Sequence, residues 1–216
     1  MKTKVLACET LRDEIELAAV QTQSDLEIGW VEADLHNFPD KLRNHLQYRL
    51  DNIVDCDRVL MAFGACRNSV VGIRTREMEL VFPKVDDCIS MLIGSVNKRE
   101  TLGENCTYFI TSGWLRRKIN IWEVQKYIVS QYGEKAGSVI TNRMLDQYQY
   151  LGLLINDHDD AASSMPVFHR ISSDLNLEER VFQTSIQYLC DLLTGPWERD
   201  RFHVFPSQSI ITAFPV

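Results

Sequence analysis

The first half of the chain alternates between short apolar runs and segments whose apolar residues recur at helical spacing. In the predicted helices, apolar residues recur every three or four positions, as Leu42, Leu46 and Leu50 do. The predicted strands are residues 4–8, 26–33, 59–63, 78–82 and 107–111, and the predicted helices between them include 10–21 and 88–96. Strands that alternate with helices in this way indicate parallel βαβ units, with helices on both faces of the sheet.

The second half is more helical. Residues 118–149 have a mainly helical pattern, and residues 150–157 read as one more strand that ends in an acidic cluster. A long helix is expected over 177–193, followed by a last short strand over 202–205. The pattern therefore predicts a mostly parallel open α/β sheet flanked by helices. We expect a single domain over 1–216, with a βαβ core in 1–117 and a helical part in 118–216 that returns to the sheet.

Charge and hydropathy narrow the classes of partner. The net charge is −7, which argues against nucleic-acid binding because phosphate contacts need clustered Lys and Arg. No apolar run approaches the length of a membrane span, and the stretch after Met1–Lys4 is interrupted at Glu9, too early for a signal peptide. We therefore expect a cytoplasmic protein without a membrane partner.

Three of the six cysteines fall where a predicted strand ends or the next helix begins. Cys8 and Cys66 follow strands, Cys88 opens a helix, and His36 lies in the loop after the second strand. The carboxyl ends of parallel strands form a common ligand-binding crevice, so these four side chains are expected to converge if the strands are neighbours. Six cysteines without an export signal indicate reduced thiols, metal ligands or catalytic groups rather than a disulfide framework.

Three thiolates and one imidazole form a suitable zinc set, so Cys8, His36, Cys66 and Cys88 are predicted metal ligands. The three cysteines alone could instead hold an iron–sulfur cluster with one open iron. The competing interpretation is that the cysteines are small packed core residues, since free cysteine is among the most buried residue types. No CxxC pair decides between these alternatives.

The turn Gly64-Ala65-Cys66-Arg67-Asn68 is a second candidate site. Backbone amides at a strand-to-helix turn can hold a phosphate or carboxylate, and Arg67 could add donors. A tight turn that needs glycine is the competing interpretation. The predicted substrate-binding residues are Gly64, Arg67, Asn68, Asp86, Asp87 and Trp114. The cluster Asp157-His158-Asp159-Asp160 could bind a hard metal or act as acid and base, or could simply be a solvated turn with a helix cap.

Several motifs occur in an order that resembles a family of uncharacterised prokaryotic proteins, a domain family of unknown function. They are Ala7-Cys8, residues 35–39, residues 63–68, Pro83 to Cys88, residues 107–114, Gly195-Pro196-Trp197 and Phe202 to Pro206. The resemblance implies an association with corrinoid-dependent methyltransferases, near which members are often encoded. In the family pattern a second glycine follows the middle cysteine, where this chain has Arg67. The third cysteine ends a His-Asp-Cys triplet, and this chain has Asp86 in place of the histidine.

Three functional hypotheses follow. The leading one is a protein with a thiolate-rich metal site, in its enzymatic form acting on a thiol- or methyl-bearing small molecule. The second is a non-catalytic accessory of a corrinoid methyltransferase system. The third is an anion- or nucleotide-binding module whose cysteines are structural.

Overall fold

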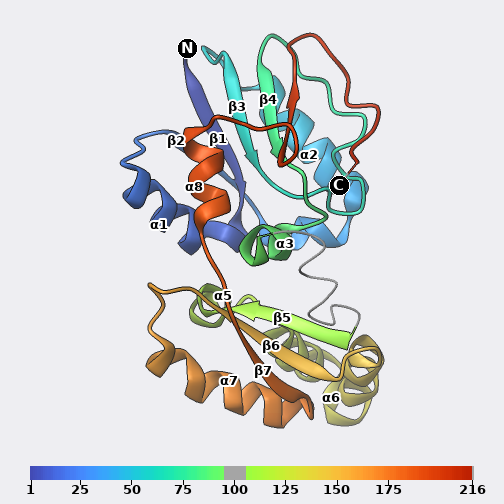
Figure 1. The fold of residues 1–216 in the computed structure, drawn as a ribbon. Helices are drawn as coiled ribbons and strands as arrows, with labels where there is room; N and C mark the ends of the chain where they lie inside the picture. The colour runs from blue at the N-terminus through green and yellow to red at the C-terminus, as the bar shows by residue number, and fades with distance from the viewer. Residues whose placement is uncertain (95–105, 216) are drawn as a thin grey trace. The chain divides into compact units, whose positions relative to one another are not determined.

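The computed structural model describes residues 1–94 and 106–215 and confirms a mixed α/β fold with mostly parallel strands (Figure 1). Contacts within the chain define two compact units. The first comprises Met1–Val96 and Ser185–Val216, and the second comprises Asn97–Thr184. The boundary expected after residue 117 lies inside the second unit, because the strand at 107–111 pairs with the strand at 150–155.

The first unit contains a five-stranded sheet. Its strands are β1 (Thr3–Cys8), β2 (Glu27–Val31), β3 (Arg58–Ala62), β4 (Glu79–Pro83) and β8 (Phe202–Phe205), in the order β2-β1-β3-β4-β8. The first four are parallel, and β8 is antiparallel to β4. In register, Ala7 of β1 lies beside Ala62 of β3. The carboxyl ends of β1, β3 and β4 therefore share one edge of the sheet.

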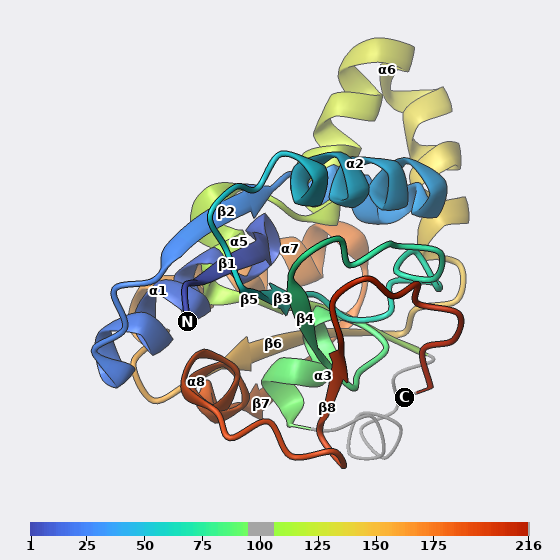
Figure 2. The ribbon, with the colours of Figure 1, turned by 90° about the horizontal axis from the view of Figure 1, so that it is seen from above.

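Helices cover both faces of this sheet, with α2 on one face and α1 and α8 on the other (Figure 2). The helical elements of the first unit are η1 (Glu9–Leu11), α1 (Arg12–Thr22), η2 (Ala33–Asn37), α2 (Pro39–Asp51), α3 (Cys88–Ile93) and α8 (Gln187–Thr194). The predicted stripe of Leu42, Leu46 and Leu50 is buried against the strands. Burying each leucine contributes roughly 1.5–3 kcal/mol.

The second unit is a smaller parallel sheet with its own core. Its strands β5 (Thr107–Thr111), β6 (Tyr150–Ile155) and β7 (Glu178–Gln183) pair in that order. Its helices are α5 (Ser112–Arg117), α6 (Ile121–Leu145) and α7 (Ala161–Leu175). Inside α6, Gly133 has φ 77° and interrupts the helix, and a Cβ at Gly137 would lie 2.9 Å from the Cα of Val129. Helix α6 is thus a hairpin whose halves approach closely at Gly137.

The helix predicted over 177–193 is wrong, since this segment contains strand β7 followed by helix α8. Val181 pairs with Leu153 of β6, and the alternating exposure of β7 is typical of an edge strand. Helix α7 (Ala161–Leu175) is not among the helices that the sequence pattern predicts. The helix expected over 88–96 ends at Ile93, with Gly94 at φ 100°, and its last two expected residues lie outside the described ranges.

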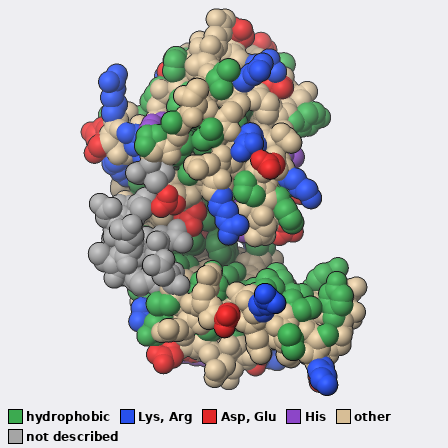
Figure 3. Space-filling model, turned by 90° about the vertical axis from the view of Figure 1, so that its right-hand side faces the viewer, with side chains coloured by type: hydrophobic (Ala, Val, Ile, Leu, Met, Phe, Trp, Pro, Cys, Tyr) green, Lys and Arg blue, Asp and Glu red, His purple; other side chains and the backbone are tan. Residues whose placement is uncertain are grey.

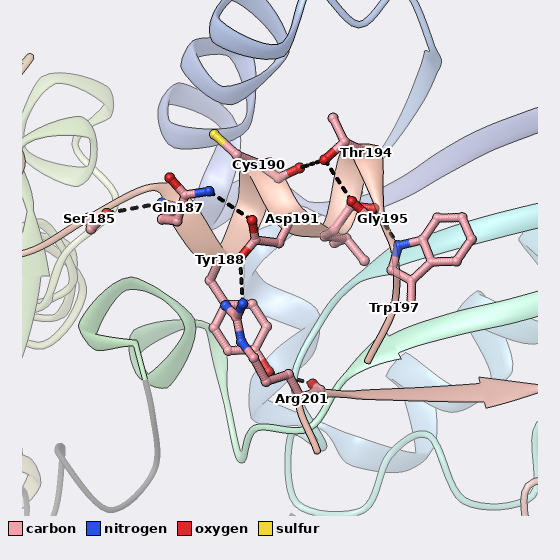
Figure 4. Close-up of polar contacts among 10 residues, drawn as sticks. Ser185, Gln187, Tyr188, Cys190, Asp191, Thr194, Gly195, Trp197 and Arg201 are labelled. Carbon is pink, nitrogen blue, oxygen red and sulfur yellow. Dashed lines mark hydrogen bonds and ion pairs between the residues drawn. The ribbon is translucent and has the colours of Figure 1, made fainter. Parts of the chain in front are cut away.

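Polar contacts join helix α8 to the segment that follows it (Figure 4). The Tyr188 hydroxyl donates to the Arg201 carbonyl, and the Arg201 guanidinium pairs with Asp191. The Trp197 indole N–H donates to the Leu192 carbonyl at 2.9 Å. Cys190 points away from this network (Figure 4), and its thiol donates to the Gln21 side chain at 3.6 Å. Cys190 is therefore a packed cysteine separate from the other thiols.

The α6 hairpin presents apolar side chains outside the core of its own unit (Figure 3). Val139 and Tyr127 are about two-thirds exposed, and Tyr132 and Met144 are also exposed. Among the described helices, none combines the length and the apolar character that crossing a membrane requires.

Candidate functional site

The strand ends of the first unit bring Cys8 and Cys66 to the same edge. Cys8 is the last residue of β1, and Cys66 lies four residues beyond the end of β3, the strand paired with β1. Both side chains belong to or pack against the same hydrophobic cluster as Phe63 and Ala65. The expected convergence of these two thiols is therefore present in the structure.

Gly64 brings the third cysteine to this edge. Its Cα packs so tightly on the neighbouring segment that an added Cβ would lie 2.4 Å from the Cα of Asp87. The amides of Ala65 and Cys66 donate to the carbonyls of Val85 and Asp86, each at 2.8 Å. Only glycine allows this approach, and the approach places the start of α3, with Cys88, beside the β3 turn.

A threonine that sequence reasoning missed contacts one of the thiols. The Thr10 hydroxyl donates to the Cys8 sulfur at 3.1 Å. Thr10 is buried, two residues after β1 in the 3₁₀ turn η1. Its only sequence signal was its position two residues after Cys8, which is too common a spacing to single it out.

The environment keeps these thiols protonated at neutral pH. Burial raises the pKa of Cys8, although hydrogen bonds from Thr10 oppose the shift. Burial, with repulsion from Cys8 and Asp87, raises the pKa of Cys66 to about 12. The pKa of Cys88 is raised for the same reasons, burial first. Cys88 stands at the start of α3, but the helix N-terminus does not lower its pKa, because burial outweighs the dipole of a six-residue helix.

The predicted metal-binding function is wrong. Within residues 1–94 and 106–215, no group of three or more His, Cys, Asp or Glu side chains is arranged to hold a metal ion. His36, the proposed fourth ligand, is exposed on η2.

The Cys66-Arg67-Asn68 turn has an unusual backbone. These three consecutive residues have φ of 42°, 58° and 61°, in the left-handed region. That conformation costs roughly 1–2 kcal/mol for each residue with a side chain. A glycine at the position of Arg67 would remove that cost. The present chain therefore places a charged side chain where the backbone favours glycine.

This turn carries hydrogen-bond donors that the protein does not use. Among the described residues, no group accepts from the backbone amides of Arg67 and Asn68, and their exposed side chains have no hydrogen-bond or ion-pair partner. Successive amides in a tight turn form a concave anion-binding surface. Asp87, in the segment that the turn hydrogen bonds, caps α3 by accepting from the Ser90 amide at 3.1 Å. The turn can therefore receive an anionic group.

Residues 30–193, most of the chain, match a protein family described as a protein of unknown function, DUF1638. The chain belongs to the DUF1638 family. This confirms the uncharacterised family expected from the motifs, and the matched range includes Cys66, Cys88 and the left-handed turn. No curated protein and no solved structure matches this DUF1638 member.

Trp114 lies in the second unit, where it packs against that unit's core. Its amide donates to the Thr111 hydroxyl at 3.2 Å at the start of α5. The structure thus explains Trp114 by packing, and its role in substrate binding stays a prediction.

The acidic cluster after β6 forms a turn and a helix cap. Asp159 accepts from the Asn156 amide at 3.0 Å, and Asp160 caps α7 by accepting from the Ser163 amide. Asp157 accepts from the Gln183 side chain. These contacts agree with the solvated-turn interpretation, which was one of the alternatives.

A shallow surface hollow in the second unit is lined by Trp122, Gln125, Lys126, Val129, Arg170 and Asp174. The Lys126 ammonium lies 3.1 Å from the Trp122 ring centroid, and the indole N–H donates to Asp174 at 3.0 Å. The charged groups of this hollow are thus engaged with one another.

Proposed function

We propose that the carboxyl edge of the first unit binds a small molecule through a carboxylate or phosphate group, which the Cys66–Asn68 turn receives. The observation that carries this proposal is that, within residues 1–94 and 106–215, one strained turn has two backbone amides and a guanidinium without partners. Ligands of open parallel sheets bind at this edge. Gly64, Arg67, Asn68, Asp86 and Asp87 are the residues we assign to the site.

The charges of the site support an anionic group with a specific orientation. The Arg67 guanidinium offers a planar set of donors that fits a carboxylate or phosphate in a bidentate manner. Asp86 and Asp87, beside the turn, repel a second negative charge. We therefore expect the anionic group to lie over Arg67 and Asn68 and the remainder of the molecule to extend along the strand ends.

The strain in the turn supports the same proposal. Three left-handed residues with side chains persist only where surrounding contacts determine them, and such residues concentrate at ligand sites. Here the surrounding contacts are the hydrogen bonds from Ala65 and Cys66 to the β4–α3 segment. The turn is consequently organised before a ligand arrives, which lowers the entropy lost on binding.

The test is isothermal titration calorimetry of the full chain with inorganic phosphate and, separately, with succinate. We expect saturable binding of at least one anion, and at least a tenfold loss in affinity for Arg67→Gln. Arg74→Gln is the matched control, because it removes an equal charge from an exposed arginine of the same unit. Equal affinities of wild type and Arg67→Gln, or no binding of either anion, would overturn the proposal.

We further propose that the small molecule belongs to a corrinoid-dependent methyltransferase system in the cytoplasm. The support is the resemblance described above together with the net charge and the six free cysteines. A direct test is to add the purified chain to a reconstituted corrinoid methyltransfer reaction and to measure its rate. An unchanged rate with wild type and with Arg67→Gln would contradict this association.

A further inference from the structure

The two halves of helix α6 carry apolar side chains that the core of the second unit does not use. Gly133 interrupts the helix, and Gly137 packs against Val129, so residues 121–132 and 134–145 form two antiparallel arms (Figure 2). In each arm, exposed or half-buried apolar residues recur at helical spacing. These residues, the α6 face, are Val124, Tyr127 and Ile128 in the first arm and Ala136, Ile140 and Met144 in the second.

Both stripes of the α6 face lie on the same side of the hairpin. Val129 and Gly137 mark where the arms touch. With about 3.6 residues per turn, each stripe lies roughly a quarter of a turn before that contact, and antiparallel arms turn this shared offset into a shared side. The offset in the other direction gives the opposite side, which carries four exposed polar residues: Lys126, Ser130, Ser138 and Asn142. The hairpin is therefore apolar on one side and polar on the other.

The α6 face is open in the part of the chain that the structure describes. Val124, Ile140 and Met144 are 42%, 37% and 43% exposed, and Tyr127 is 65% exposed. A contiguous apolar patch of this kind on a folded protein marks an interaction surface. Two helices alone bury only the seam between them, so an apolar side of a hairpin needs a second layer of structure.

We propose that the α6 face joins two copies of this chain, so that their α6 hairpins pack against each other as a four-helix bundle. Helices in such bundles lie about 20° from antiparallel or parallel and bury apolar stripes between them. The proposal concerns the second unit alone and does not depend on anion binding at the Arg67 turn.

The charges beside the α6 face are complementary to those of a second copy. Glu123 precedes Val129 by as many residues as Arg143 follows Gly137, so the two charges lie at one level of the hairpin, on the outer flanks of its arms. A two-fold axis along the hairpins places the first arm of one copy over the second arm of the other. Glu123 of each copy then lies on the same flank as Arg143 of the other, and symmetry makes this pair twice. Among the described residues, Arg143 has no carboxylate partner, and Glu123 pairs only with the exposed Lys126.

The size of the α6 face sets the strength of the dimer. Each arm of about 12 residues is roughly 18 Å long, and two arms side by side are roughly 20 Å wide. A stable interface buries about 800 Å² on each partner, and weak ones bury less than about 600 Å². A face of this size lies near that lower limit, so we expect a dissociation constant in the micromolar range.

The experiment is sedimentation velocity of the full chain, which has a monomer mass of 24.9 kDa. Measurements run from about 1 to about 200 µM, on both sides of the expected dissociation constant. We expect a shift from monomer to dimer across this range. Hydrogen exchange at the two extremes should show added protection of α6 peptides at the higher concentration. A monomer at every concentration, or protection confined to other elements, would overturn the proposal.

Substitutions on opposite sides of one arm test which side is the interface. Ile140→Lys places a charge in the middle of the α6 face and should weaken the dimer about tenfold or more, because the charge is buried without a partner. Ser138→Lys is the matched control, since it adds the same charge to the polar side of the same arm. Val124→Lys, on the other arm, repeats the test independently. Equal dimer affinities of Ile140→Lys and Ser138→Lys would contradict the assignment, and unchanged exchange of β6 peptides in Ile140→Lys verifies that the unit stays folded.

The charge pair has its own readout. Arg143→Glu should weaken the dimer by a few-fold, and adding Glu123→Lys should restore the affinity, because the exchange of signs recreates both pairs. A double variant that binds no more tightly than Arg143→Glu would refute the two-fold arrangement. If the wild type stays monomeric while Ile140→Lys changes hydrogen exchange in the first unit, the face packs on its own chain and the proposal fails. Arg67→Gln should leave the dimer unchanged, so failure of the anion site and failure of the dimer can be distinguished.

Discussion

Gly64 is the residue whose replacement tests most sharply how the site is assembled. In Gly64→Ala, the new Cβ would lie 2.4 Å from the Cα and 2.5 Å from the N of Asp87. Both atoms belong to the backbone, so no side-chain rotation relieves the clash. The segment from Val85 to Cys88 must move away from the β3 turn, which separates Cys88 from Cys8 and Cys66.

The loss of folding stability in Gly64→Ala has two contributions. Overpacking a well-packed site costs typically 1–3 kcal/mol. The displacement also breaks the hydrogen bonds from Ala65 and Cys66, and the loss of each costs roughly 0.5–1.5 kcal/mol. We therefore expect Gly64→Ala to destabilise the first unit by about 2–6 kcal/mol. Gly29→Ala is the control, because its nearest contact is the flexible end of the Arg49 side chain at 2.7 Å.

Because the chain has two units, a single unfolding midpoint would mix two transitions. Hydrogen exchange with mass spectrometry at increasing urea avoids this difficulty, since peptides from β1 and β3 report the opening of the first unit alone. Gly64→Ala should lower the opening free energy of both peptides, and Gly29→Ala should change it by less than about 1 kcal/mol. Equal effects of the two substitutions would refute the close approach at Gly64.

Four further changes test other parts of the structure. Arg67→Gly should stabilise the first unit by about 1 kcal/mol, because glycine adopts positive φ freely. The same substitution should weaken phosphate binding. A lower stability in urea would contradict the claim that the backbone at Arg67 is strained. The first unit should lose stability between pH 9.0 and about 12, where the unfolded chain releases the Cys66 proton and the folded protein keeps it, with full stability below pH 9.0. Cys66→Ser should make that loss less steep, measured by urea unfolding, while Cys8 and Cys88, whose pKa burial also raises, keep part of it. An equally steep loss would exclude Cys66 as a source. Asp87→Asn should lower the pKa of Cys66 and Cys88 and keep the hydrogen bond that caps α3 at Ser90. Asp87→Ala should lower the same pKa values and also destabilise the first unit by about 1 kcal/mol through loss of the cap. Alkylation rates measured against pH report the charge effect, and unchanged rates in both variants would rule it out. Gly133→Ala should destabilise the second unit by roughly 1–2 kcal/mol, because φ is 77° at the break in α6, and an unchanged hydrogen-exchange profile of α6 would contradict this.

Sequence periodicity predicted the strands and helices around the first sheet because each element buries one continuous apolar face. The placement of Cys8, Cys66 and Cys88 at strand ends followed from the same pattern. Their actual proximity depends on the strand order β1-β3-β4, which no local pattern encodes. Periodicity failed at β7, where the exposed edge strand has charged residues that also suit a helix.

The chemistry of the site was less predictable than its position. Cysteine spacing suggested ligands, but the protonation of the thiols depends on burial and on Asp87, which comes from another strand end. The hydrogen bond from the Thr10 hydroxyl to the Cys8 sulfur likewise depends on the turn that follows β1. For the left-handed backbone at Cys66, Arg67 and Asn68, the local sequence gives one indication, the asparagine, which adopts positive φ more readily than most residues.

The most direct test of the central claim is a titration of the ¹⁵N-labelled full chain with inorganic phosphate, followed by amide NMR spectra. The account predicts that the backbone amides of Arg67 and Asn68 shift saturably, and that the same amides stay fixed in Arg67→Gln at the same phosphate concentrations. If those amides do not move in the wild type, or if the shifts cluster on another part of the chain, the left-handed turn is not the anion-binding site.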